Sequence, residues 1–170
     1  MSEPLSSARM PSASPSSDTW RSGGVWLGLG IGGFFDGIVL HQVLQWHHLV
    51  SHIHPPTTLD NLQLNTLADG LFHAATWVFT LIGLALLWRG MRGTHRPRPT
   101  SAFVGALMFG WGLFNVGEGL VSHHLLELHH VRPGPDQLAY DLGFLAWGAA
   151  MLVTGWLLMR GGRRSTPHSD

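Results

Sequence analysis

Four long apolar stretches alternate with short polar segments along the chain, at residues of about 23–49, 69–88, 102–130 and 137–159. A helix needs about 20 apolar residues to cross the hydrocarbon core of a bilayer, and each stretch reaches that length. The pattern therefore predicts an all-α, polytopic membrane protein with four transmembrane helices packed as a bundle. The glycine-rich first stretch suits close packing against another helix.

The segments outside the four stretches are polar. Residues 1–22 are rich in serine and proline and predict a disordered tail, and residues 161–170 predict a second, short tail. The transmembrane domain is then expected to cover residues 23–160. The segment 52–69 predicts a loop between the first two spans, and the Pro-Gly-Pro sequence at 133–135 ends the third.

The placement of arginine predicts how the helices are oriented. Four arginines lie in the linker between spans two and three and three more lie at the C-terminal end, whereas the loops after spans one and three contain only Arg132. Cytoplasmic loops of membrane proteins are enriched in basic residues. We therefore expect both termini to be cytoplasmic, with the protein in the inner (plasma) membrane of a bacterium.

Composition narrows the possible chemistry. The chain has no cysteine, which excludes disulfides, thiolate ligands and iron–sulfur clusters. Ten basic residues balance ten acids without forming a basic face, so nothing indicates binding to nucleic acid. The twelve histidines are the unusual feature, because ten of them lie between His41 and His130, not counting the linker. Ionisable groups in or beside membrane spans are costly and are candidates for function.

These polar residues gather at one end of the predicted helices. The outer ends of spans one and three carry most of the histidines, while acids and one further histidine begin spans two and four. The residues concerned are His41, His47, His48, Asp69, His73, His123, His124, His129, His130 and Asp141. Each helix has two ends, so this convergence predicts a shared site at one membrane face.

The strongest motif is an internal repeat. Residues 36–48 read DGIVLHQVLQWHH and residues 118–130 read EGLVSHHLLELHH, so that a carboxylate, a glycine and three histidines match without gaps. A weaker similarity relates DGLFHA, beginning at Asp69, to DLGFLA, beginning at Asp141, with Leu145 in the place of His73. The sequence predicts two tandem two-helix repeats related by a pseudo-two-fold axis along the membrane normal.

Helical spacing predicts that the histidines form two layers. In a continuous helix His48 would lie about 10 Å from His41 along the axis, too far for both to bind one metal ion. We therefore expect an inner layer of His41, His73 and His123. The expected outer layer contains His47, His48, His129 and His130, with His124 available beside them.

The residue types indicate transition-metal chemistry. Imidazole suits zinc, copper, iron and nickel, and carboxylates favour iron or zinc within this group. The alternative is that the inner histidines are buried and simply hydrogen-bonded to acids. Asp36 and Glu118 are expected to orient histidines or to transfer protons. Asp69 and Asp141 are secondary candidates for the site, and each could instead cap the first turn of its helix.

Three segments carry a family resemblance: DGIVLHQVLQWHH, DGLFHA and FNVGEGLVSHHLLELHHVRPG. In them the chain resembles a family of bacterial four-helix membrane proteins described only as a domain of unknown function. The resemblance extends from about Gly23 to Met159 and implies a fold but no activity. More loosely, the chain is similar to histidine-rich membrane hydroxylases and desaturases with two irons. Their motifs are HxxxH or HxxxxH and HxxHH, whereas this chain has H-x5-HH and HH-x4-HH.

Three functions follow from this pattern. The leading interpretation is a membrane metalloprotein, a metal-dependent oxidoreductase, with redox or oxygen-linked chemistry near the extracytoplasmic face. A second is that the protein binds copper or zinc and delivers it to a partner such as a respiratory oxidase. A third is a haem b electron carrier with His41 and His123 as axial ligands. The glycine-rich first span would also allow the protein to form a homo-oligomer.

Overall fold

The computed structural model describes residues 15–92 and 99–161 of the 170-residue chain. The remaining parts of the expected tails and linker, with their arginines, lie outside the described residues. The elements are α1 (Pro15–Phe35), the π-helix η1 (Asp36–Val43), α2 (Leu59–Met91), α3 (Thr100–Glu118), the π-helix η2 (Gly119–Leu125) and α4 (Gln137–Gly161). In the part of the chain that the structure describes, four helices are long and apolar enough to cross a membrane. The all-α membrane fold predicted from the sequence is confirmed.

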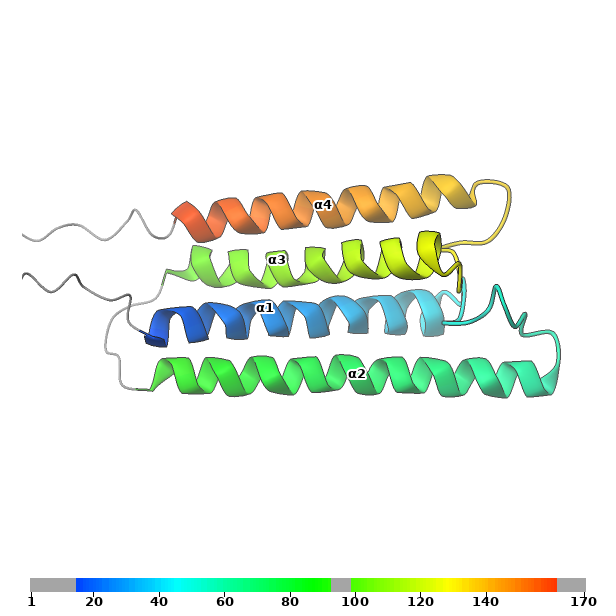
Figure 1. Ribbon diagram of the computed structural model, residues 1–170, viewed down its shortest axis with the longest axis horizontal. Coiled ribbons are helices and arrows are strands. Elements are labelled where there is room, and N and C mark those ends of the chain that lie inside the picture. The colour runs from blue at the N-terminus through cyan, green and yellow to red at the C-terminus, as the bar shows by residue number, and fades with distance from the viewer. Residues whose placement is uncertain (1–14, 93–98, 162–170) are drawn as a thin grey trace, which may run out of the picture.

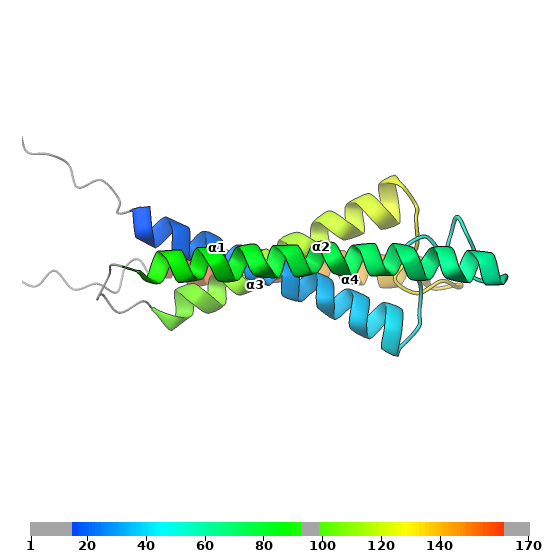
Figure 2. The same cartoon turned by 90° about the horizontal axis from the view of Figure 1, so that it is seen from below.

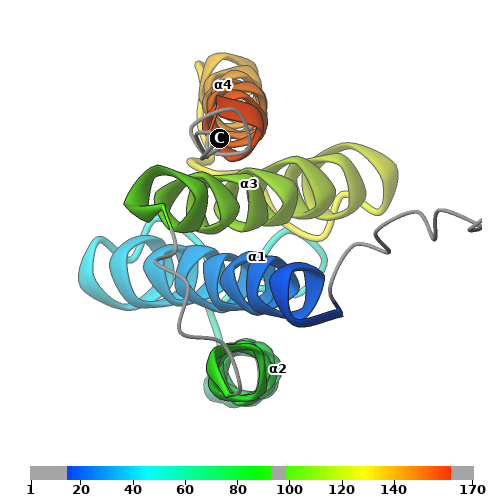
Figure 3. The same cartoon turned by 90° about the vertical axis from the view of Figure 1, so that its left-hand side faces the viewer.

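The four helices pack as a row in the order α2, α1, α3, α4 (Figure 1). The central helices α1 and α3 cross each other, whereas α2 and α4 cover them on opposite sides (Figure 2, Figure 3). The start of α1 and the end of α4 lie at one end of the molecule, and the loops that follow η1 and η2 lie at the other (Figure 1). The fold therefore brings the two histidine-rich segments to the same end.

Glycine permits the crossing of α1 and α3. A Cβ atom at Gly28 would collide with the backbone carbonyl of Leu107, and one at Gly110 would collide with that of Val25. Helix backbones can approach this closely only where no side chain intervenes. The crossing point thus fixes how the ends of α1 and α3 are placed relative to each other, and these ends carry the histidines.

Two helices begin earlier than the sequence predicted. Residues 15–22 of the expected N-terminal tail belong to α1. The expected loop at 52–69 is shorter, because α2 begins at Leu59, where the Thr58 hydroxyl accepts a hydrogen bond from the backbone N–H of Asn61. Asp69 lies inside α2 and does not cap it. Its carboxylate is therefore available to accept hydrogen bonds from the histidines.

Candidate metal centre

The histidine-rich end of α1 is a π-helix that stops abruptly. In η1 the backbone widens, and Leu44 N–H donates to the Val39 carbonyl at 2.8 Å. Gln45 then adopts a left-handed conformation with φ of 50°, a common way to end a helix. The chain reverses, and His47 returns to the bundle with its ring centroid 4.4 Å from that of His41.

The end of α3 repeats this geometry in η2. Leu126 N–H donates to the Val121 carbonyl at 2.8 Å, and Glu127 takes the left-handed conformation with φ of 48°. The chain reverses again, so that the rings of His129 and His123 lie 4.8 Å apart. Each of these features has a counterpart at the end of α1. Adding 82 to the residue numbers of the earlier feature gives those of the later one. The tandem repeat itself stays a prediction, and these contacts support it.

The predicted separation into two histidine layers is wrong. It assumed a continuous helix through His48 and through His130, but the helical segments end at Val43 and Leu125. Because the chain turns back after each helix, residues six apart in sequence lie side by side. The first HH pair thus contributes His47 to the inner group instead of forming an outer one.

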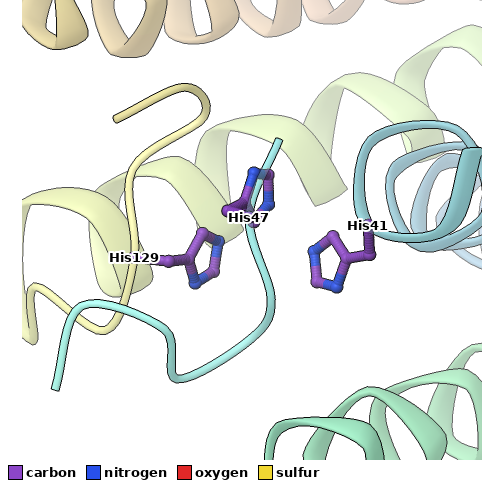
Figure 4. Close-up of side chains that lie close together, drawn as sticks. All are labelled: His41, His47 and His129. Carbon is purple, nitrogen blue, oxygen red and sulfur yellow. The ribbon is translucent and has the colours of Figure 1, made fainter. Parts of the chain in front are cut away.

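The four-histidine cluster consists of His41, His47, His123 and His129, all buried. Figure 4 shows three of them: His41 at the end of η1, His47 in the loop that follows it, and His129 in the loop after η2. The rings of His47 and His129 stack, with centroids 4.4 Å apart and an interplanar angle of 7°. His41 lies beside His47 in this pair, and His123 lies beside His129.

The two stacked histidines are oriented by backbone carbonyls from the opposite half of the chain. His47 Nδ1 donates to the Val131 carbonyl at 2.8 Å, and His129 Nδ1 donates to the Leu49 carbonyl at 2.9 Å. A carbonyl oxygen can only accept, so each Nδ1 carries a hydrogen. In the neutral imidazole the lone pair is therefore on Nε2, which is the atom that remains available as a ligand.

The other two histidines lie beside carboxylates on the outer helices, and of these two only His41 is hydrogen-bonded through Nδ1. His41 Nδ1 lies 2.9 Å from Oδ1 of Asp69 on α2. His123 Nδ1 lies 3.5 Å from Oδ1 of Asp141 on α4. Both aspartates also hold the second residue of the neighbouring HH pair, since His48 Nδ1 is 2.7 Å from Asp69 Oδ2 and His130 Nδ1 is 2.7 Å from Asp141 Oδ2. Asp69 and Asp141 thus act as anchors that hold the histidines in place.

The Nε2 atoms of the four-histidine cluster are buried, and among the described residues none of them makes a hydrogen bond. Ligand atoms of His41, His47 and His129 lie within 4.8 Å of one another, as do those of Glu118, His123 and His129. A tetrahedral ion with bonds of about 2.0–2.1 Å needs ligand atoms about 3.3 Å apart, so the rings would close in on the ion when it binds. Histidines that bind metals usually donate their other N–H to a carboxylate or carbonyl, as His41, His47 and His129 do. This cluster could hold a metal ion.

Two buried carboxylates face the same nitrogen atoms. Asp36 Oδ2 lies 3.2 Å from His41 Nε2. Glu118 Oε1 lies 2.9 Å from His129 Nε2, and Oε2 lies 3.3 Å from His123 Nε2, yet none of these contacts has hydrogen-bond geometry. A lone pair facing a carboxylate away from water is unfavourable unless a cation lies between them. The arrangement therefore calls for either protons or a metal ion.

Burial keeps one member of the cluster uncharged. Burial, together with the neighbouring imidazoles of His129 and His41, lowers the pKa of His47 from its usual value of 6.5 to about 2. His47 lies outside the membrane-spanning segments and is thus neutral at any physiological pH. A neutral imidazole is the form that binds metal ions.

Of the four predicted ligands outside the cluster, His48 and His130 are held by Asp69 and Asp141, and the other two lie elsewhere. His73 donates from Nδ1 to the carbonyl of Asp69 at 2.8 Å, and its buried Nε2 lies against Gly37 on η1. Leu145 occupies the matching place against Gly119 on η2, as the sequence comparison predicted. His124 is exposed. Neither histidine belongs to the two groups of possible ligands.

Sequence reasoning missed the two carbonyls that orient His47 and His129. Leu49 and Val131 each follow an HH pair directly, and their own N–H groups donate to Asp69 and Asp141 at 2.8 and 2.9 Å. Every residue has a carbonyl, so residue type provides no signal. The 82-residue offset between these two positions is the one clue that the sequence contains.

Comparison with known families adds one finding to this geometry. Residues 23–162 match the family described as "Predicted membrane protein (DUF2243)", over more than half of the chain. The chain belongs to this family. No curated protein and no solved structure matches it. Membership in DUF2243 supports the membrane location and leaves the chemistry to be argued from the site.

The four-histidine cluster does not fit the haem alternative. Haem between His41 and His123 would need a flat slot between the two rings. The ring of His47 lies 4.4 Å from that of His41, and the ring of His129 lies 4.8 Å from that of His123, so each expected axial ligand already has another imidazole packed against it. The four buried Nε2 atoms instead suit a small ion, because imidazole is a common ligand of copper, iron and zinc.

Proposed function

We propose that this membrane protein is a metalloprotein that binds one transition-metal ion through the Nε2 atoms of the four-histidine cluster. The observation that carries the proposal is the set of four buried Nε2 atoms without hydrogen bonds, in rings of which three are oriented by a hydrogen bond at Nδ1. Burying one such nitrogen without a partner is costly, and burying four together is explained if an ion binds them.

One ion per chain is the stoichiometry that we expect. The two possible ligand groups share His129, and a neutral imidazole has a single lone pair on Nε2. The groups therefore cannot each bind a separate ion through this residue. Asp36 and Glu118 would balance the positive charge of the ion and are close enough to accept protons from the ligand shell.

The role that we favour is redox chemistry with copper or iron. Zinc has no redox chemistry, whereas copper and iron bind imidazole and change oxidation state. Rings that are held by hydrogen bonds on both halves of the chain would move little when the charge of the ion changes. The buried carboxylates support coupled proton transfer, because a proton can compensate each electron.

Delivery of copper or zinc to a partner protein is the second candidate. It is favoured by the position of His47, which belongs to the cluster and also lines a cavity at the loop end of the molecule. An ion bound for delivery should exchange readily, whereas a redox ion should be retained. The rate at which a chelator removes the ion distinguishes the two roles.

We further propose that the cluster faces the extracytoplasmic side of a bacterial inner membrane. Arg89 and Arg160 lie in the last turns of α2 and α4, at the end opposite the histidines. Basic residues mark the cytoplasmic side of membrane proteins. A reporter domain fused after Asp170 should be active only in the cytoplasm, and activity outside would invert the orientation.

Elemental analysis and spectroscopy of detergent-purified protein test the function. We expect one copper or iron per chain, no haem absorption, and loss of the ion in His41→Ala. A reversible change in the electron paramagnetic resonance signal on reduction would support redox chemistry. Protein from metal-replete cells that contains no ion would refute the metal site and leave proton-bound histidine–carboxylate pairs.

A further inference from the structure

A cavity of about 480 Å³ lies beside the four-histidine cluster, between the loops that follow η1 and η2. Four of its lining side chains are imidazoles, those of His47, His48, His52 and His130, and no carboxylate lines it. Calcium and magnesium require oxygen ligands, whereas first-row transition metals accept nitrogen. The lining therefore suits first-row transition-metal cations and does not suit calcium or magnesium.

Two of these imidazoles are each fixed by an aspartate through one ring nitrogen, so that the other ring nitrogen faces away from that aspartate. His48 and His130 are fixed through Nδ1 by Asp69 and Asp141. The side chains remain 20 and 12% exposed, and among the described residues their Nε2 atoms make no hydrogen bond. Both nitrogens are thus available to an ion in the cavity.

His52 completes the lining from the loop side. Its ring lies edge-on to that of His130, with centroids 5.2 Å apart. Its backbone N–H donates to the carbonyl of Leu128 at 3.0 Å, which pins this loop against the segment after η2. Position 134, which is 82 residues further on, is a glycine. The second half of the chain therefore offers no equivalent imidazole.

We propose that this cavity is the route by which the metal ion enters and leaves, and that His52 and His130 form an exchangeable pair of ligands for a transition-metal cation near its mouth. His47 lines the cavity and also belongs to the four-histidine cluster. An ion held by the pair can thus exchange one imidazole for the next on its way in, without passing through a state that lacks protein ligands. This inference rests on the proposed metal site.

The kinetics of Co²⁺ uptake by the purified full-length protein test this route, because tetrahedral Co²⁺ is followed by its visible absorption. We expect His52→Ala to slow both uptake and removal by a chelator about tenfold, the effect of about 1.4 kcal/mol on the barrier. The final amount bound should not change, because His52 is outside the cluster. Its backbone hydrogen bond to Leu128 does not depend on the side chain.

His54→Ala is the matched control. His54 is exposed on the same loop and does not line the cavity. Wild-type rates in this variant together with slow rates in His52→Ala support the route. Equal rates in all three proteins, or equal slowing in both variants, refute it while the metal site stands. If the wild-type protein binds no Co²⁺, the metal site fails and the route fails with it.

Discussion

The imidazole rings of His47 and His129 lie parallel, with centroids 4.4 Å apart, although the two residues are 82 positions apart in sequence. Neither ring is oriented by its own half of the chain, because the Nδ1 atoms donate to the carbonyls of Val131 and Leu49. Two parallel rings with free Nε2 atoms form the middle of the proposed ligand set. Loss of either ring should therefore weaken metal binding before it affects any other property of the protein.

We expect His47→Ala to weaken metal binding by at least 10–100-fold, the range reported for loss of groups that merely support a ligand. The helices should still form, because their packing does not depend on this side chain. Metal content and equilibrium titration with Co²⁺ measure the effect, and circular dichroism checks the fold. Metal affinity equal to that of His54→Ala would remove His47 from the ligand set.

Asp69→Asn should reduce both stability and metal affinity. The carboxylate accepts hydrogen bonds from His41, His48 and the Leu49 N–H, and an amide has only one oxygen with which to replace them. We expect a loss of about 1–3 kcal/mol in the free energy of unfolding of the metal-free protein. Asp141→Asn should behave similarly. Unchanged thermal unfolding in both variants would contradict the role of these acids as anchors.

The crossing of α1 and α3 should not tolerate a methyl group. A Cβ at Gly110 would collide with the Val25 carbonyl, whereas Gly117 on the same helix has open space around it. Gly110→Ala should therefore cost about 1–3 kcal/mol, as overpacking does, and Gly117→Ala should leave stability unchanged or raise it. Thermal unfolding in detergent measures both. Equal effects of the two substitutions would show that this contact does not limit the packing.

The metal-free protein should lose stability as the pH falls below about 6.5. His47 has its pKa lowered to about 2 in the folded state, so between these values only the unfolded chain takes up the proton. One such group changes the free energy of unfolding by up to about 1.4 kcal/mol per pH unit. His47→Gln should show a shallower dependence than the wild-type protein over this range. An identical dependence would mean that His47 is not buried in its neutral form.

Replacing His73 by leucine, the residue found at the equivalent position 145, should leave metal binding intact. In His73→Leu the side chain would match Leu145, and the buried Nε2 without a partner would be removed. We expect unchanged metal content and a gain of up to about 1 kcal/mol in stability. A loss of metal in this variant would instead make His73 a ligand, and the asymmetry between the halves would become part of the chemistry.

The sequence predicts the helices and their shared histidine-rich end well, because both follow from local features of the chain, the length of the apolar stretches and the grouping of the histidines. It does not predict how the histidines meet. The chain reversals depend on left-handed conformations at Gln45 and Glu127, which are uncommon for residues other than glycine and leave no mark in composition. Without those reversals, helical spacing separates His41 from His47, and the layered arrangement follows.

The early start of α2 was missed for a different reason. The segment after Thr58 is polar on several sides, which resembles a loop, yet α2 extends beyond the apolar stretch by about three turns. That extension places Asp69 well inside a helix. A carboxylate on a regular helix is held more rigidly than one at a fraying end, and this rigidity is what an anchor for two histidines requires.

His47 donates a hydrogen bond to the carbonyl of Val131, and His129 donates one to the carbonyl of Leu49, so the two halves of the chain orient each other's histidines. This has a consequence for how the protein is made. The first helix pair leaves the ribosome before Val131 exists, so His47 has no orienting partner while only that pair is in the membrane. The proposed metal centre would therefore be complete only when both pairs have inserted and docked. Capture of the ion would thereby be confined to chains whose insertion is complete, and a stalled or half-inserted chain would not sequester metal.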